Sequence, residues 1–193
     1  MTYKIAGVLL AAGMSRRAGP VNKLLAPVAG VAMVRRALAA MVEGGCAPVV
    51  VVTGHQAARV QAELAGDGIL FAHNPAYGEG MGPSLRTGIA ALPADVDAAI
   101  IGLGDMPHVE AQTYRQLIKS FSPSDGHKIC MPGYQGKPGN PVLFGRRFFA
   151  ELMAIAGDRG GRSVVTDNPA AVIDVAVEDP GIHLDHDTVQ GLA

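Results

Sequence analysis

The feature that most constrains this chain is the stretch from residue 5 to residue 25, IAGVLLAAGMSRRAGPVNKLL. Its first part, Ile5–Ala12, is an apolar run that is long enough for a strand buried on both faces and too short to span a membrane. A glycine-containing loop follows, and Arg16, Arg17 and Lys23 make it basic. Glycines let backbone N–H groups approach an anion, and loops at the carboxyl ends of buried parallel strands bind ligands in open α/β sheets. The stretch therefore predicts a polyphosphate site, most simply one for a nucleoside triphosphate.

Two common phosphate-binding patterns do not fit this loop. The P-loop needs Gly-Lys-Ser/Thr, but Lys23 lies between Asn22 and Leu24, and Gly13 does not begin a G-x-G-x-x-G pattern. Two other interpretations stay open. The run after Lys4 could belong to a secretory signal peptide, or the glycines could form a plain turn with no ligand.

Composition narrows the class of protein. A length of 193 residues predicts one domain, residues 1–193, and the 49% hydrophobic and 17% charged content predicts a globular core. The net charge of −1 argues against a nucleic-acid-binding surface. Cys46 and Cys130 form no CxxC pair, so we expect buried, chemically dispensable thiols in a reducing cytoplasm. The chain lacks 18 consecutive apolar residues, so we expect no transmembrane helix.

Hydrophobic periodicity predicts strands that alternate with helices. We expect strands at residues 4–10, 48–52, 69–72, 98–103, 129–131, 142–144 and 172–175. We expect helices at residues 32–42, 56–64, 83–92, 110–120, 146–156 and 163–168. Alternation with short connections predicts a three-layer α/β fold, in which helices cover both faces of a mostly parallel sheet.

One carboxylate, Asp105, follows the apolar run 98–103 within the sequence Gly-Leu-Gly-Asp-Met-Pro. An aspartate at the end of a central strand is poorly placed for packing, and it is well placed to hold a divalent cation beside the phosphates of the first loop. A helix-capping aspartate is the alternative.

Three further loops carry candidate binding residues. Glycines and a proline gather at residues 78–83, where the helix predicted at residues 83–92 begins. Ser84 in its first turn is either a ligand contact or a helix cap. Gly54 ends a buried strand, and His55 after it is more typical of a plain loop histidine. Residues 157–162 read Gly-Asp-Arg-Gly-Gly-Arg, which favours an anionic group or a solvated turn.

The sequence His-Leu-Asp-His-Asp-Thr at 183–188 is ambiguous. Two histidines and two aspartates suggest a zinc or iron site, whereas Mg²⁺ prefers oxygen ligands, and only Asp185 and Asp187 supply them. An acidic tail is the third interpretation.

These motifs together resemble the MobA-like NTP transferase family, specifically molybdenum cofactor cytidylyltransferases. The first loop fits the pattern L-A-A/G-G-x-S-x-R-x-G followed by D/N-K-L-L at Leu10, Ala12, Gly13, Ser15, Arg17, Gly19, Asn22 and Lys23. Residues 74–85, the G-D-M-P at 104–107, residues 136–144, residues 157–162 and the D-x-D-T at 185–188 resemble later motifs in the same order. The resemblance implies the nucleotide-diphospho-sugar transferase fold, which is Rossmann-like.

The resemblance also implies roles for individual residues. The nucleotide would contact Leu10, Ala11, Ala12, Gly13, Ser15, Arg17, Lys23, Gly54, Asn74, Gly80 and Ser84. Catalysis would depend on Arg17, Lys23 and Asp105, and the metal on Asp105 with Asp187 or Asp185. The second substrate would contact Gly139, Asn140, Pro141, Asp158, Arg159 and Arg162.

The implied reaction is transfer of CMP from CTP to molybdopterin or molybdenum cofactor, with release of pyrophosphate and with Mg²⁺, or Mn²⁺, as cofactor. Ala12 favours CTP, because family members that use GTP have glycine there. The implied partners are a molybdopterin-type phosphate acceptor and a molybdenum-hydroxylase apoenzyme or its chaperone. The alternatives are transfer of GMP or another nucleotide to a different acceptor, an NAD(P)H-dependent oxidoreductase on the same fold, and a non-catalytic cofactor-binding chaperone.

Overall fold

The computed structural model describes residues 3–14, 22–66, 68–121 and 127–185. Its centre is an eight-stranded sheet in the order β10-β7-β9-β6-β1-β4-β5, with β8 paired to β7. The strands are β1 (Ile5–Ala11), β4 (Val49–Thr53), β5 (Ile69–His73), β6 (Ala98–Leu103), β7 (Ile129–Tyr134), β8 (Lys137–Pro138), β9 (Val142–Gly145) and β10 (Val172–Ala176). Pairing is parallel except where β9 meets β6 and β7 and where β8 meets β7, which confirms the mostly parallel sheet.

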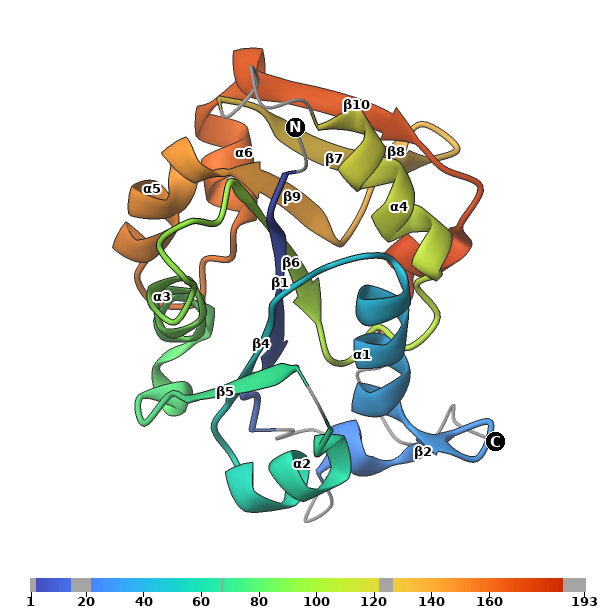
Figure 1. Cartoon of the computed structure of the whole chain (residues 1–193), viewed down its shortest axis with the longest axis vertical. Helices are drawn as coiled ribbons and strands as arrows, with labels where there is room; N and C mark the ends of the chain where they lie inside the picture. The colour runs from blue at the N-terminus through green and yellow to red at the C-terminus, as the bar shows by residue number, and fades with distance from the viewer. Residues whose placement is uncertain (1–2, 15–21, 67, 122–126, 186–193) are drawn as a thin grey trace.

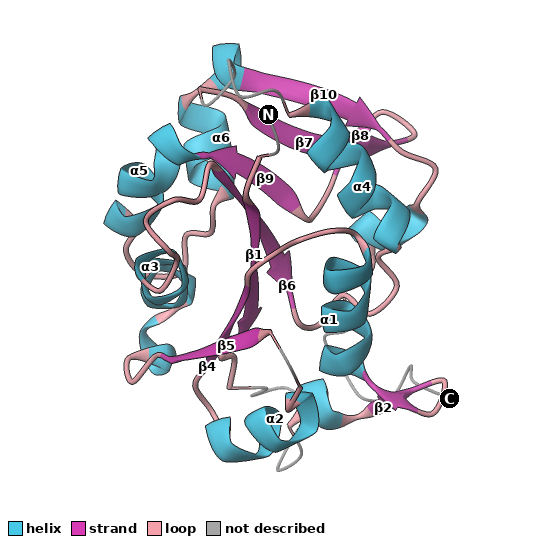
Figure 2. Ribbon diagram, viewed as in Figure 1, coloured by secondary structure: helices cyan, strands magenta, loops and turns pink. Residues whose placement is uncertain are grey.

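Helices cover both faces of this sheet, as Figures 1 and 2 show. They are α1 (Met33–Glu43), α2 (Ala57–Leu64), α3 (Met81–Ala90), α4 (Ala111–Ser120), α5 (Phe149–Ala154) and α6 (Arg162–Asp167). Alternate residues of β1 divide the core, because Leu9 packs with α1, α2 and α4 while Val8 packs with α3, α5 and α6. The three-layer α/β prediction is therefore confirmed. None of the described helices is both long and apolar enough to cross a membrane.

Strand β1 lies at the point where the order of strands reverses. The chain passes from β1 to β4 and β5 on one side, and then returns to β6 on the other side of β1. In open α/β sheets, ligands bind outside the carboxyl ends of strands at such a switch point. The loop after β6 is joined to the end of β1 there, because Gly104 N donates to Leu10 O at 2.9 Å.

The structure differs from the predicted elements mainly at residues 146–156. A 3-10 turn, Arg146–Phe148, precedes α5 there, and the helix stops at Ala154. The turn is tied to the sheet, because Arg146 N donates to Asp97 O at 2.9 Å while the Phe148 side chain is fully buried. A two-stranded ribbon of β2 (Pro27–Val28) and β3 (Val31–Ala32) was also not predicted.

Candidate active site

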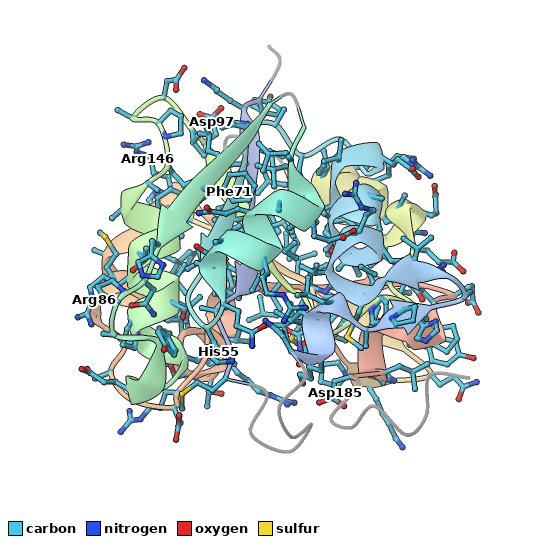
Figure 3. The ribbon with its side chains drawn as sticks, turned by 90° about the horizontal axis from the view of Figure 1, so that it is seen from below. His55, Phe71, Arg86, Asp97, Arg146 and Asp185 are labelled. Atoms are coloured by element: carbon cyan, nitrogen blue, oxygen red, sulfur yellow. The ribbon has the colours of Figure 1, made fainter. Side chains whose placement is uncertain are left out.

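The two edges of the sheet are distinct in Figure 3. His55, which follows β4, and Asp185 lie toward one end of the molecule, whereas Asp97 and Arg146 lie toward the other. Because β4 ends before His55 and β6 begins after Asp97, the end with His55 and Asp185 holds the carboxyl ends of the central strands. Two adjoining cavities open at this carboxyl edge, and both include residues predicted for the site.

The first cavity has a volume of about 380 Å³. We call it the donor cavity, because residues predicted to bind the nucleotide, the donor of the transferred group, line it. Its lining residues are Leu10, Ala12, Gly13, Met14, Lys23, Leu24, Tyr77, Gly78, Gly80, Met81, Ser84, Leu103, Asp105 and Asp158. Six predicted nucleotide-binding residues are among them: Leu10, Ala12, Gly13, Lys23, Gly80 and Ser84. The structure thus brings the loop after β1, the start of α3 and the loop after β6 around one space.

Three other predicted nucleotide-binding residues are buried and do not line the donor cavity. Ala11 is 1% exposed and packs into the core beneath α1. Gly54 packs so closely on Tyr77 that a Cβ atom would lie 2.5 Å from the Tyr77 Cβ. Asn74 is buried, and its Nδ2 donates to Ser84 Oγ at 3.0 Å, so it fixes a lining residue from behind. Ser15 and Arg17 lie outside the described residues.

An ion pair joins the two sides of the donor cavity. Lys23 Nζ donates to Asp105 Oδ2 at 2.8 Å, and the two side chains are only 14% and 25% exposed. Lys23 begins the 3-10 turn Lys23–Leu25, which Asn22 caps by accepting a hydrogen bond from Leu24 N at 3.1 Å. Asn22 is itself buried, so the backbone that carries the lysine is fixed against the core. A basic and an acidic group that lie far apart in the sequence therefore face the same space.

The second cavity has a volume of about 440 Å³ and adjoins the first. We call it the acceptor cavity, because residues predicted to bind the second substrate line it. It is lined by Met81, Ile101, Leu103, Met106, Met131, Pro138, Gly139, Asn140, Val142, Phe144, Gly160, Gly161, Arg162, Val165, Ile182, His183 and Asp185. Met81 and Leu103 line both cavities. Most side chains that line the acceptor cavity are apolar, and Asn140, Arg162, His183 and Asp185 add polar groups.

The residues predicted for the second substrate separate into groups. Gly139, Asn140 and Arg162 line the acceptor cavity. Pro141 follows Asn140 in the sequence and is not part of the lining. Asp158 lines the donor cavity instead. Arg159 lines a third cavity, which lies beside α5 and α6 with Glu151 and Asp167.

The predicted metal ligands are also divided by position. Asp105 lines the donor cavity and Asp185 the acceptor cavity, while Asp187 lies outside the described residues. Among the described residues, no group of three or more His, Cys, Asp or Glu side chains is placed to hold a metal ion. The oxygen donors of Asp105 and Asp185 nevertheless suit Mg²⁺ or Mn²⁺, and Asp105 already accepts a cationic group, the Lys23 ammonium.

Sequence reasoning missed one residue that shapes this region, Asp179. It is 3% exposed, and its Oδ2 accepts hydrogen bonds from Glu110 N at 2.9 Å and Thr113 Oγ1 at 2.6 Å. Its Oδ1 accepts a hydrogen bond from Gly181 N at 2.8 Å. Asp179 therefore holds the start of α4 against the segment that carries Asp185. The Asp-Pro-Gly sequence at 179–181 is a capping pattern, and it was the available signal.

Several known proteins resemble this chain. The family model described as MobA-like NTP transferase domain matches residues 7–172. The bifunctional protein GlmU of Sphingopyxis alaskensis is 32% identical over 76% of this chain, which spans about a third (32%) of that relative. Nicotine blue oxidoreductase of Paenarthrobacter nicotinovorans is 29% identical over 96% of this chain and 93% of its own.

The fold has solved counterparts as well. The crystal structure of Rv0371c from Mycobacterium tuberculosis is 30% identical, with a TM-score of 0.86 over 98% of this chain and 96% of that one. A structure of Rv0371C in complex with manganese is 28% identical, with a TM-score of 0.75 over 92% of this chain and 89% of that one.

Proposed function

Because the chain belongs to the MobA-like NTP transferase family, we propose that it is a nucleotidyltransferase that transfers CMP from CTP to a molybdopterin-type phosphate acceptor. The observation that carries this proposal is the position of Asp105. Its side chain lines the donor cavity and pairs with Lys23, while Leu103 and Met106 on either side of it line the acceptor cavity. A group held at Asp105 therefore lies at the boundary between two substrates.

The donor cavity has the chemistry that a triphosphate requires. Gly13 offers backbone at the mouth of the loop after β1, and α3 begins at Met81 with its N-terminal end at the cavity. Lys23, which also lines the donor cavity, supplies a positive charge. Arg17 would add a second cation from the same loop, as the family motif implies.

The acceptor cavity suits a flat, weakly polar ring system. Met106, Met131 and Phe144 supply polarisable or aromatic surface, and a pterin presents two such faces. Arg162 and Asn140 remain available for the polar edge and for the phosphate of the acceptor.

The reaction follows from this placement. A phosphate oxygen of the acceptor attacks the α-phosphorus of CTP, the bond from the α-phosphorus to the bridging oxygen breaks, and pyrophosphate leaves. Asp105, with Asp185 or Asp187, would hold Mg²⁺ or Mn²⁺, which when bound supplies charge neutralisation to the phosphates. Lys23 stabilises the charge that develops on the departing pyrophosphate. Orientation and charge stabilisation suffice, so no covalent enzyme intermediate is required.

The preference for CTP rests on Ala12. This residue is 4% exposed and lies in the wall of the donor cavity, packed against the core. Its methyl group takes space that a glycine would leave beside the base, which favours a pyrimidine. One methyl group gives a modest discrimination, on the order of 1–3 kcal/mol.

A second candidate function is reduction of a substrate by NAD(P)H. Similarity over almost the whole chain to a protein named nicotine blue oxidoreductase favours it. The apolar side chains of the acceptor cavity, such as Met131 and Phe144, would also contact an aromatic substrate.

One experiment separates the two candidates. The protein is supplied with Mg²⁺, molybdopterin and each of ATP, GTP, CTP and UTP in turn, and the release of pyrophosphate is measured. We expect release with CTP that depends on molybdopterin. Release with GTP and not with CTP would contradict the CTP preference. A parallel assay supplies NAD(P)H together with nicotine blue, the compound in that relative's name, and follows the absorbance of the reduced cofactor. Oxidation of NAD(P)H there, with no pyrophosphate release from any nucleotide, would support the second candidate. A molybdenum-hydroxylase apoenzyme or its chaperone remains the proposed recipient of the product.

A further inference from the structure

Lys23 and Asp105 engage each other, although the proposed function requires each to engage a different partner. The lysine is expected on the phosphates and the aspartate on a divalent cation. Lys23 Nζ lies 2.8 Å from Asp105 Oδ2, within a cavity that both side chains line. A second cation at that oxygen would lie within a few ångströms of the ammonium, and repulsion at such distances is strong in a partly buried site.

We infer that Lys23 is the resident cation of Asp105, and that the triphosphate exchanges it for a divalent cation. This inference rests on the proposed function. The triphosphate attracts the lysine ammonium, and the release of Asp105 then creates the metal position. The metal and the nucleotide therefore bind as a coupled pair, and the coupling is reciprocal because it is thermodynamic.

The local structure allows this exchange without a change of fold. The buried, capped turn at Asn22 fixes the backbone of Lys23, whereas rotation about the bonds of its four methylene groups can change the position of the ammonium. The backbone of Asp105 is fixed as well, because Gly104 N donates to Leu10 O and Met106 N to Leu103 O. Only the tip of one side chain has to move.

The chain contains a matched control for this pair. Lys4 Nζ lies 2.8 Å from Asp95 Oδ2, the same distance as in the Lys23 pair, but these side chains are 40% and 70% exposed. Neither residue lines any of the three cavities described above. Disruption of this control pair should leave metal binding unchanged.

The first test measures Mn²⁺ binding without nucleotide, by electron paramagnetic resonance of the free ion and by calorimetry. We expect K23M to bind Mn²⁺ about tenfold more tightly than wild type, because the competing charge is removed. K4M should bind like wild type, and K23R, which keeps the charge, should bind as weakly as wild type. Circular dichroism melting curves establish that each variant is folded, and K23Q replaces K23M if that variant is not.

The second test measures CTP binding in EDTA. We expect D105N to bind CTP more tightly than wild type, because the neutral asparagine holds the lysine ammonium less strongly than the carboxylate does. Removal of a negative charge would also help CTP binding by itself, so the double variant K23M/D105N completes the cycle. If the exchange operates, the gain from D105N is largely lost in the K23M background.

The inference is overturned if K23M and wild type bind Mn²⁺ equally, or if D105N improves CTP binding by the same factor with and without Lys23. Equal Mn²⁺ affinity of D105N and wild type would also overturn it, because Asp105 would then not hold the metal. Neither test uses an acceptor. A failure of molybdopterin to support pyrophosphate release would therefore contradict the proposed function and leave the exchange standing.

Discussion

Two lysine–aspartate pairs lie at opposite edges of the sheet, and the N–O distance is 2.8 Å in both. At the amino edge, the pair of Lys4 with Asp95 is exposed, and nearby polar groups form hydrogen bonds with other residues of the protein. Asp97 accepts a hydrogen bond from Lys4 N at 2.9 Å, and Arg146 donates to Val96 O at 2.8 Å. At the carboxyl edge, the pair of Lys23 with Asp105 is more buried and faces a cavity.

The two pairs have the same geometry, and they differ in burial and in what lies beside them. The hydrogen bond from Lys4 lowers the pKa of the Asp95 carboxyl, and this has no consequence beyond the surface. The same chemistry beside two cavities places a movable cation and a potential metal ligand where substrates would meet. The parallel strands cause this asymmetry, because their loops converge at the carboxyl edge of the switch point.

The sharpest test of the comparison replaces the aspartate of each pair. We expect Asp105→Asn to lower kcat by about 10³-fold, because a lost metal ligand removes several kcal/mol of stabilisation from the transition state. Asp95→Asn should leave kcat unchanged. The measurement is pyrophosphate release under saturating CTP, molybdopterin and Mg²⁺, with melting curves to confirm folding. Near-normal turnover by Asp105→Asn would remove the difference between the two edges.

A second test concerns two arginines that the sequence could not tell apart. We expect Arg162→Ala to raise the KM for the acceptor about 10- to 100-fold, because Arg162 lines the acceptor cavity and would lose a charge-assisted hydrogen bond. Arg159→Ala should change this KM little, because Arg159 lines the third cavity. Equal effects of the two substitutions would show that the acceptor lies elsewhere.

A third test asks whether the acceptor side depends on Asp179. Its carboxylate accepts from three donors, and an asparagine NH₂ group would leave at least one of them unpaired. We expect Asp179→Asn to lower the free energy of unfolding in urea by about 1–3 kcal/mol. The KM for the acceptor should rise more than the KM for CTP, because the segment before Asp185 is displaced. Thr113→Val removes one donor only and should show a smaller effect in the same direction.

Sequence patterns grouped the residues of the donor cavity more completely than those of the acceptor cavity, and the reason is physical. The loop after β1 is contiguous, so Leu10, Ala12, Gly13 and Lys23 stand close together in both sequence and space. The acceptor cavity combines β6, residues 138–140 at and after the end of β8, α6 and the segment before Asp185, and no single short motif covers them. Local sequence patterns also could not distinguish Arg159 from Arg162. The cavity that each arginine side chain lines depends on how the backbone turns before α6.

The smallest expected effect belongs to the cysteines, which are buried in the core and line none of the three cavities. Burial disfavours the thiolate and raises the pKa of Cys46 to about 12, from an ordinary value of 9.0. At pH 8 only about one Cys46 thiol in ten thousand is ionised, and Cys130 is fully buried. We therefore expect no reaction of the native protein with a thiol-specific disulfide reagent, full reaction in denaturant, and normal turnover of a folded Cys46→Ser, Cys130→Ser variant.

The raised pKa of Cys46 also gives a sign for the dependence of stability on pH. Above pH 9 the unfolded chain releases the Cys46 proton while the native chain keeps it, so ionisation favours unfolding and stability falls as the pH rises. Burial raises the pKa of Tyr114 as well, but its unfolded form ionises only near 10, so pH 8 to 10 reports chiefly on the thiol. The measurement is the urea midpoint of wild type and of Cys46→Ala across that range. We expect the decline to be shallower in the variant, and identical slopes would show that Cys46 is less isolated from water than its 4% exposure indicates.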